Sequence, residues 1–518
     1  MVRNPDLDAP LARRHDCRIT GRRVGAAVVG RTPDSVEPGR ASATFGGKRV
    51  TVMGLGVLGG GVGVCRYLVS RGARVTVTDM RDEAELSEPL AALAGLPVTA
   101  HLGGHQIEDF RSARADVVVR NPGVPYDSPY IAAARADGVA VEMEMSIFFR
   151  ACPVPILAVT GTKGKTTVSA LLGEIVTAWR SDALLAGNMG VSALPELDRL
   201  ERDTPVVLEL SSFQIESLIE HELAPHVAVI TNISEDHLDR YKDFAEYSGV
   251  KRGLTRAMTG DDVVVYNRDD AEASRVERET RARLMPFGLD EPPGDGAWIR
   301  SGSELMVRWN GGTRGWERPS VLSLQGDHGA MNALAALAAA RAYGVPEDAI
   351  SSGLARFKGV PNRLEEVAVI DGVAFVNDTS ATAPAAATAG VRVLGPRTQV
   401  LHLIAGGADK RTDLAPFADQ ISVSSARVYL LEGTATGALH HLLDERSVPV
   451  EGRFASMEEA VKAAAEGATS GDIVALCPGC ASFGMFRNEF DRGDRFRAAV
   501  MGMMRRGALA ASGQTASG

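Results

Sequence analysis

The chain has 518 residues, enough for about three domains of ordinary size. Its formal net charge of -9 argues against a general nucleic-acid-binding protein, and its five cysteines are too few and too scattered for a disulfide framework. No apolar run approaches the roughly 18 residues of a membrane span, and the amino end lacks the apolar core of a signal peptide. We therefore expect a cytoplasmic protein in which Cys477 and Cys480 are structural thiols.

The first regular pattern begins after residues 1–47, which are rich in arginine, proline and glycine and are expected to form a flexible extension. Residues 50–53 predict a strand, and a second predicted strand over 74–78 ends at Asp79. The turn after the first strand has the spacing G-x-G-x-x-G, with Gly54, Gly56 and Gly59. Such a turn followed by an acid is typical of dinucleotide sites, so alone it favours NAD or FAD.

A third strand is predicted over 116–120, and it leads into a turn that contains Asn121 and Gly123. Ligands of open α/β sheets bind at the carboxyl edge of the strands, which is where this turn would lie. A plain turn between a strand and a helix explains Asn121 equally well.

A polar, glycine-containing loop separates a predicted buried strand over 156–159 from a predicted helix over 168–176. The loop consists of Gly161, Thr162, Lys163, Gly164, Lys165, Thr166 and Thr167. Backbone N–H groups in such a loop form a nest for phosphate, Lys165 would reach the β- and γ-phosphates, and Thr166 would offer its hydroxyl to Mg²⁺. Val159 stands where the full phosphate-loop pattern has glycine, so a glycine-rich turn without a ligand is the alternative.

Two further strand ends supply groups suited to a hard metal ion. Glu209 lies near the end of a predicted strand over 205–210, and His237 follows a predicted strand over 226–231. A carboxylate and a neutral imidazole beside the hydroxyl of the phosphate loop would form a metal site next to a triphosphate. Lys251 falls within a predicted helix, where a solvated lysine is the ordinary expectation.

The rest of the chain predicts strands over 262–266 and 304–309, a helix over 331–343 that ends at Gly344, and a third α/β series. The strands of that series are predicted at 373–377, 400–404 and 473–476. They would form another parallel sheet with Lys410 and Ser482 near its functional edge. We expect domains at 48–150, 151–358 and 359–505, and a disordered tail over 506–518.

The motifs resemble those of the Mur ligases, the ATP-dependent enzymes that build the peptide of peptidoglycan. The resemblance covers roughly residues 48–505, and it is greatest to the glutamate-adding branch at 208–214 and 235–241. It implies an α/β fold of three domains: a Rossmann-like domain for a UDP-sugar, a central ATPase domain of phosphate-loop type with a parallel sheet, and a Rossmann-like carboxyl-terminal domain.

The resemblance also implies the binding residues. The UDP-sugar would contact Gly54, Gly56, Gly59, Asp79, Arg81, Asn121, Gly123 and Asn188. ATP would contact the phosphate loop together with Asn332, Arg363 and Asp378. The incoming amino acid would meet Thr382, Lys410 and Ser482. Two Mg²⁺ ions would be held by Thr166, Glu209, His237 and Lys251, the last as a carbamate. Lys165, Glu209, His237 and Lys251 would form the catalytic set.

The implied reaction joins D-glutamate to UDP-N-acetylmuramoyl-L-alanine through an acyl phosphate, with ATP as phosphoryl donor, in a monomer that spans no membrane. Four positions depart from the family pattern: Lys163, Asn362, Ser380 and the pair Glu489–Phe490. Two of these lie in the implied amino-acid pocket, so addition of L-glutamate or of another amino acid is the leading alternative. A phosphate-loop ATPase without ligase activity, an NAD-dependent oxidoreductase, a folylpolyglutamate synthase and a non-catalytic binding module are the others.

Overall fold

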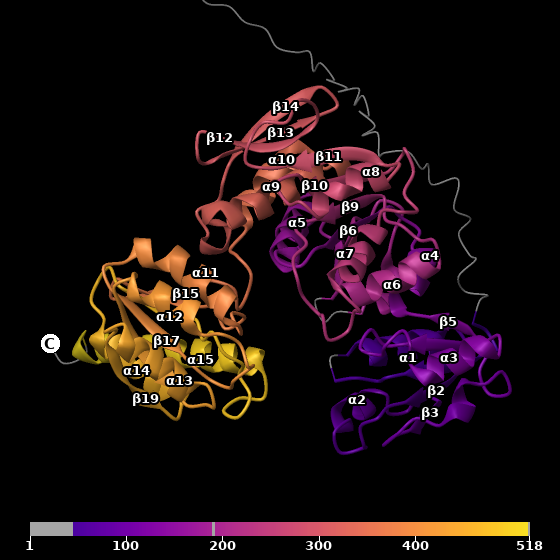
Figure 1. Cartoon of the computed structure of the whole chain (residues 1–518), viewed down its shortest axis with the longest axis horizontal. Helices are drawn as coiled ribbons and strands as arrows, with labels where there is room; N and C mark the ends of the chain where they lie inside the picture. The colour runs from indigo at the N-terminus through magenta and orange to yellow at the C-terminus, as the bar shows by residue number, and fades with distance from the viewer. Residues whose placement is uncertain (1–44, 58, 189–191, 516–518) are drawn as a thin grey trace, which may run out of the picture.

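The computed structural model describes residues 45–57, 59–188 and 192–515, which form three α/β units (Figure 1). Most of the expected flexible extension, residues 1–44, lies outside the described residues. Phe45 is buried in the first core and the Gly47 N–H donates to the Gly72 carbonyl, so packing begins ahead of the expected boundary at residue 48.

The first unit is a parallel sheet with the strand order β3-β2-β1-β4-β5. Its strands are β1 (Arg49–Met53), β2 (Arg74–Thr78), β3 (Val98–His101), β4 (Val117–Arg120) and β5 (Ala140–Glu142). The covering helices are α1 (Gly60–Ser70), α2 (Ser87–Ala92) and α3 (Pro129–Ala136), and α4 (Glu144–Ala151) leads out of the unit. This strand order is that of a Rossmann-type sheet, whose switch point lies between β1 and β4.

The central unit holds nine strands in the order β14-β13-β12-β11-β10-β9-β6-β8-β7. The parallel strands are β6 (Ile156–Thr160), β7 (Leu184–Gly187), β8 (Val206–Glu209), β9 (Val227–Ile230), β10 (Val263–Asn267), β11 (Arg283–Phe287) and β12 (Gly296–Arg300). The antiparallel extension is β13 (Glu304–Trp309) and β14 (Gly312–Glu317). The helices are α5 (Lys165–Trp179), α6 (Ser212–Glu220), α7 (Phe244–Gly253), α8 (Val276–Glu279), α9 (Gly326–Tyr343) and α10 (Glu347–Arg356).

The third unit is a six-stranded sheet with the order β15-β16-β20-β17-β18-β19. Its strands are β15 (Glu365–Ile370), β16 (Val373–Asn377), β17 (Leu401–Ala405), β18 (Ala426–Leu431), β19 (Val450–Phe454) and β20 (Ile473–Leu476). All pairs are parallel except β15 with β16. The helices are α11 (Pro384–Leu394), α12 (Ala415–Ser422), α13 (Thr436–Glu445), α14 (Met457–Gly467) and α15 (Glu489–Thr515).

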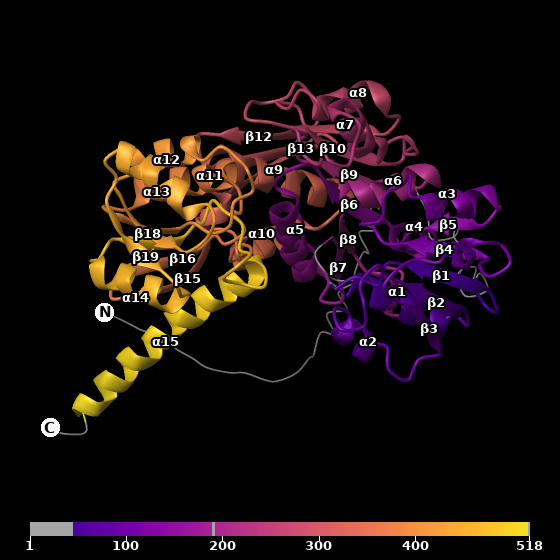
Figure 2. The ribbon, with the colours of Figure 1, turned by 60° about the horizontal axis from the view of Figure 1, so that its bottom comes forward.

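The predicted fold class is confirmed, because each unit combines a mainly parallel sheet with flanking helices. The helix α15 continues to Thr515, through most of the tail over 506–518 that was expected to be disordered, and projects beyond the third unit (Figure 2). Alanines at 508, 510 and 511 and leucine at 509 favour helix strongly, which explains the continuation. Within the described ranges, no helix has the length and apolar character needed to cross a membrane.

Candidate active site

The phosphate loop connects β6 to α5 and contacts asparagine side chains from two other segments. The backbone N–H of Lys163 donates to Asn232 Oδ1 at 2.9 Å, and that of Thr162 donates to the Asn232 carbonyl at 2.8 Å. Gly164 has φ +86°, and a Cβ at this position would lie 2.3 Å from Asn332 Oδ1. Asn332, predicted to contact ATP from α9, therefore packs directly against the loop.

Two lysines, the half-buried Lys165 and the buried Lys251, point at the same loop carbonyl. Lys165 Nζ donates to the carbonyls of Gly161 and Thr162, each at 3.0 Å, and Lys251 Nζ donates to the Gly161 carbonyl at 2.8 Å. Burial lowers the pKa of Lys165 and lowers that of Lys251 well below its usual value; repulsion from Lys165 also contributes to the Lys251 shift. Lys251 is 2% exposed, so the reading of it as a solvated helix lysine is wrong. Two lysine amines thus lie where phosphate oxygens are expected.

Glu209, at the end of β8, has one carboxylate oxygen that no side chain or backbone group of the described residues contacts by a hydrogen bond. Its Oε1 accepts a hydrogen bond from Asn188 Nδ2 at 3.1 Å, whereas its buried Oε2 has no hydrogen-bond partner among the described residues. An unpartnered buried carboxylate oxygen is costly unless a cation binds it, so Glu209 fits a divalent metal ion. Asn188, predicted to contact the UDP-sugar, thus lies beside Glu209 rather than on the first sheet.

His237 lies on an exposed turn after β9 and has φ +52°, which is unusual for a non-glycine residue. Its ring packs against Phe213 and Tyr247, with ring-centroid distances of 5.0 and 6.2 Å. Tyr247 Oη is 3.1 Å from Thr162 Oγ1, which links this aromatic cluster to the phosphate loop.

The predicted metal ligands do not by themselves form a complete protein cage. Among the described residues, no group of three or more His, Cys, Asp or Glu side chains is arranged to hold a metal ion. Glu209 with the Thr166 hydroxyl could anchor Mg²⁺ only if phosphate oxygens and water complete the shell, which is the usual arrangement for Mg²⁺ at a nucleotide.

The predicted UDP-sugar residues of the first unit meet at the carboxyl edge of β1, β2 and β4. Asp79 Oδ2 accepts hydrogen bonds from the Leu55 and Gly56 N–H groups at 2.9 and 3.1 Å, and Asp79 Oδ1 accepts one from the Arg81 N–H at 3.0 Å. Gly59 is the residue before α1. On the neighbouring turn, Asn121 Oδ1 accepts from the Gly123 N–H at 3.0 Å, and Asn121 Nδ2 lies 3.4 Å from the Gly54 carbonyl.

The predicted residues of the third unit fall into two groups. Asp378 Oδ1 accepts from the Leu364 N–H at 3.1 Å, and burial raises the pKa of Asp378 to about 7. Burial is the main cause of the lowered pKa of Lys165, and the positive charge of Arg363 from the third unit contributes to it. The second group lies at the same carboxyl edge of the sheet, where Lys410 after β17 donates from Nζ to Thr382 Oγ1 after β16 at 2.9 Å.

Ser482 is buried directly after the bridge between Ala408 and Ala481, which holds its segment beside the Lys410 segment. The Ser482 segment also meets an arginine that the sequence did not single out, and this arginine contacts Thr379 after β16 as well. Arg492 is fully buried and donates to Thr379 Oγ1, to the Thr379 carbonyl and to the Cys480 carbonyl at 3.0 to 3.1 Å. No local pattern distinguishes this arginine from the solvated arginines that surround it in α15. Cys477 and Cys480 are free and buried, as expected of structural thiols.

A phosphate loop between two Rossmann-like units, with lysines and a carboxylate converging on it, defines a multidomain α/β protein that binds nucleotides. Three family models then match successive parts of the chain: the Mur ligase MurD-like N-terminal domain over 48–142, the Mur ligase middle domain over 159–340, and the Mur ligase glutamate ligase domain over 362–480. The chain belongs to the Mur ligase family.

Curated relatives agree over nearly the whole length. A UDP-N-acetylmuramoylalanine--D-glutamate ligase from Roseiflexus sp. (strain RS-1) is 45% identical over 88% of this chain and 98% of its own, and one from Symbiobacterium thermophilum is 36% identical over the same shares. Among solved structures, the UDP-N-acetylmuramate-alanine ligase MurC of Thermotoga maritima is similar, with a TM-score of 0.56 and 20% identity over 88% of this chain and all of its own. MurF from Acinetobacter baumannii has a TM-score of 0.55 at 18% identity, over 77% of this chain and 93% of its own. These structures bear on the fold alone.

Proposed function

We propose that this chain is an ATP-dependent ligase that joins D-glutamate to UDP-N-acetylmuramoyl-L-alanine in the synthesis of peptidoglycan precursors. The observation that carries the proposal is the 45% identity, over 98% of the relative's length, to a ligase named for this reaction. The converging groups at the phosphate loop support it, because phosphoryl transfer to a carboxylate brings several anionic oxygens together and requires positive charge around them.

The chemistry has two balanced steps. An oxygen of the alanine carboxylate attacks the γ-phosphorus of ATP, and the bond between that phosphorus and the oxygen bridging to the β-phosphate breaks. ADP is the leaving group, and the product is an acyl phosphate. The glutamate amine then attacks the acyl carbon, inorganic phosphate leaves, and the nitrogen loses a proton. Activation is necessary because a free carboxylate is anionic and has no good leaving group. Water must be excluded in between, since an acyl phosphate hydrolyses.

Residues of the central unit have distinct proposed roles. Lys165, which contacts two loop carbonyls, would pair with the phosphates of ATP. Thr166 and Glu209 would hold Mg²⁺, which would supply further charge neutralisation. His237 lies on the exposed turn where it can meet the substrate. Lys251 has a lowered pKa and hence a larger fraction of neutral amine, the form that reacts with carbon dioxide, so its carbamylation and a second Mg²⁺ belong to the proposal.

The flanking units supply the two substrates to be joined. The turn with Asn121 and the glycines around Asp79 hold the sugar nucleotide, and Thr382, Lys410 and Ser482 hold glutamate. We favour D- over L-glutamate because the named relatives add the D form, even though Ser380 replaces a lysine of the family pattern. An ATPase without ligase activity is disfavoured because the family matches include both flanking units. A monomer in the cytoplasm is also proposed.

The test measures phosphate release and coupled product formation with the full-length protein. Release should require UDP-N-acetylmuramoyl-L-alanine, Mg²⁺ and D-glutamate together, and parallel reactions with L-glutamate and meso-diaminopimelate should give little product. Full-rate phosphate release without the sugar nucleotide would contradict the ligase assignment, and faster turnover with L-glutamate would reverse the stereochemical one.

A further inference from the structure

Arg240 connects the turn at 121–124 of the first unit with the turn of the central unit that carries His237. Its guanidinium donates to three successive carbonyls of the turn after β4: Gly123 at 3.0 Å, Pro122 at 3.3 Å and Val124 at 2.8 Å. This is the turn that holds Asn121, a predicted sugar-nucleotide contact. One planar cation thereby holds three consecutive peptide groups of a different unit through two terminal nitrogens whose spacing is fixed, whereas an ammonium group would donate from a single point.

The same side chain is tied to His237 on the other side. The backbone N–H of Arg240 donates to the His237 carbonyl at 2.9 Å, so both residues belong to one tight turn. The guanidinium also lies over the Phe213 ring, 4.6 Å from its centroid, and the His237 ring packs against that same Phe213. A displacement of Arg240 therefore moves His237 through the backbone and through the shared aromatic contact.

A second arginine closes this arrangement into a ring of interactions. Arg120, fully buried at the end of β4, donates to the Val124 carbonyl at 2.9 Å and pairs with Glu216 of α6 at 2.8 Å. Glu216 Oε1 also accepts from Tyr241 Oη at 2.9 Å, and Tyr241 follows Arg240 in the chain. Arg120 and Arg240 therefore share the Val124 carbonyl, and Glu216 joins Arg120 to Tyr241, the residue next to Arg240. Each of these contacts restrains the others.

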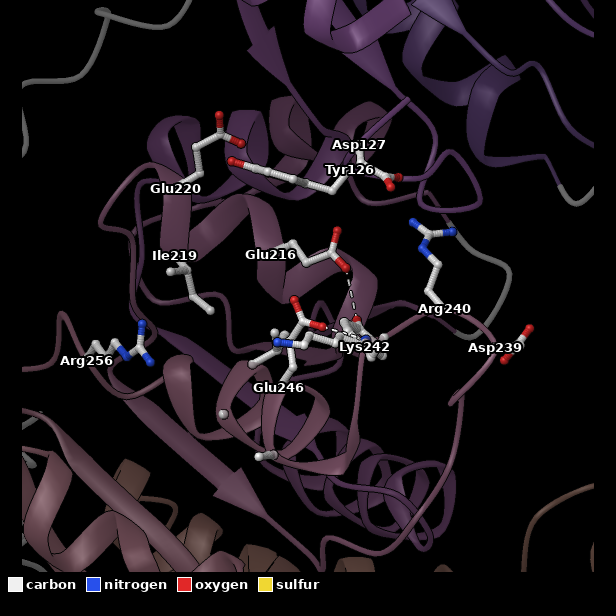
Figure 3. A pocket seen from close by; sticks show the side chains of 14 residues that line it. Tyr126, Asp127, Glu216, Ile219, Glu220, Asp239, Arg240, Lys242, Glu246 and Arg256 are labelled. Atoms are coloured by element: carbon white, nitrogen blue, oxygen red, sulfur yellow. Dashed lines mark hydrogen bonds between the residues drawn. The ribbon is translucent and has the colours of Figure 1, made fainter. Parts of the chain in front are cut away.

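Arg240 and Glu216 line one wall of a cavity of about 790 Å³ between α6, α7 and the segment with Tyr126 and Asp127 (Figure 3). The cavity lining contains none of the predicted site residues, so Arg240 lies between this open space and the aromatic cluster around His237. Because solvent fills the cavity side, the position of Arg240 depends on its carbonyl and aromatic partners rather than on dense packing all round.

We propose that Arg240 is a positioning residue that couples the sugar-nucleotide turn at 121–124 to the His237 turn, so that the carboxylate substrate is held in register with the phosphate loop. This proposal rests on the function proposed above. It assigns no contact between Arg240 and the substrate: Arg240 acts through the shape of the turn that binds it.

The experiment compares Arg240→Ala and Arg240→Lys with a matched control at the same interface. The control is Arg135→Ala, which removes an equal charge and breaks the pair with Glu220 at 3.0 Å, but leaves the carbonyls of 122–124 untouched. We expect Arg240→Ala to raise KM for the sugar nucleotide at least tenfold while KM for ATP stays within twofold. Arg240→Lys should recover part of that loss, and Arg135→Ala should stay within twofold of the wild type throughout.

Calorimetric titration of UDP-N-acetylmuramoyl-L-alanine into each folded variant measures the same effect without turnover. A wild-type protein that binds this nucleotide but forms no product would contradict the proposed function and leave the Arg240 comparison intact. A dissociation constant for Arg240→Ala within threefold of the wild type, or an equal loss in Arg135→Ala, would overturn the positioning role. A uniform fall in kcat that tracks a smaller folded fraction, with KM unchanged, would likewise indicate a merely structural role.

Discussion

Replacing Gly164 by alanine is expected to damage the phosphate loop in two independent ways. Gly164 is the residue before α5 and adopts φ +86°, a left-handed conformation that L-residues avoid. The added Cβ would also lie 2.3 Å from Asn332 Oδ1, closer than atoms can pack, and 3.2 Å from Asn332 Cγ, which is a tight contact. Either the loop or Asn332 must therefore move.

The magnitude follows from these two effects. A left-handed conformation costs an L-residue about 1–2 kcal/mol, and overpacking at a tight site costs about 1–3 kcal/mol more. If the loop keeps its shape, the free energy of unfolding of the central unit falls by about 2–5 kcal/mol. If the loop yields instead, the cost appears as weaker nucleotide binding, and each ~1.4 kcal/mol lowers affinity about tenfold.

The assay uses a feature of the composition that separates the central unit from its neighbours. All four tryptophans of the chain lie in the central unit: Trp309 and Trp316 belong to its core, Trp179 packs against that core, and Trp298 is buried on β12. Tryptophan fluorescence during urea unfolding therefore reports this unit, and calorimetric titration with a non-hydrolysable ATP analogue reports the loop. We expect Gly164→Ala to lower the unfolding midpoint, to weaken binding at least tenfold, or both.

Gly249→Ala is the matched control, because a Cβ at Gly249 would meet nothing within 4 Å and its φ is not positive. Gly249 lies inside α7, where alanine should stabilise the helix by about 0.5–1 kcal/mol. Two results would contradict this prediction. One is a Gly164→Ala variant with the wild-type urea midpoint and a dissociation constant for the analogue within twofold of the wild type. The other is a shift of the urea midpoint in the same direction in both variants.

Two further predictions concern the third unit. Asp378 has a pKa of about 7 in the folded protein against a usual value of 3.8, so the folded state binds more protons, and the resulting stability is present at low pH and lost as pH rises through about 7. Without nucleotide, urea unfolding followed by circular dichroism should show the wild type losing on the order of 2 kcal/mol relative to Asp378→Asn between pH 5 and 7; parallel pH profiles would contradict this. Arg492→Leu removes three hydrogen bonds and leaves two buried carbonyls without their donor, which should cost about 3 kcal/mol of stability and raise KM for glutamate more than KM for ATP; an unchanged ratio of the two KM values would show that Arg492 does not shape the amino-acid pocket.

Much of the framework could be predicted from local sequence. Short apolar runs that end in glycine or polar residues predicted β1, β6 and β16 and the turns behind them, because a buried parallel strand needs apolar side chains on both faces. The phosphate loop could also be predicted locally, because the glycines and lysines of such a loop stand at fixed spacing. The predicted fold class and the family resemblance are confirmed, whereas the individual binding residues stay predictions.

What local sequence could not determine is which charged side chains are buried and what they meet. Lys251 looks like any helix lysine until α7 packs it against the Gly161 carbonyl, 90 residues away in sequence. Arg240 and Arg492 gain their roles from carbonyls more than 100 residues distant in sequence or on another loop. Sequence alone determined the strands, turns and phosphate loop, because those depend on neighbours along the chain. Only the tertiary structure decided the electrostatics of the site, because the burial of a charge depends on the distant segments that exclude water from it.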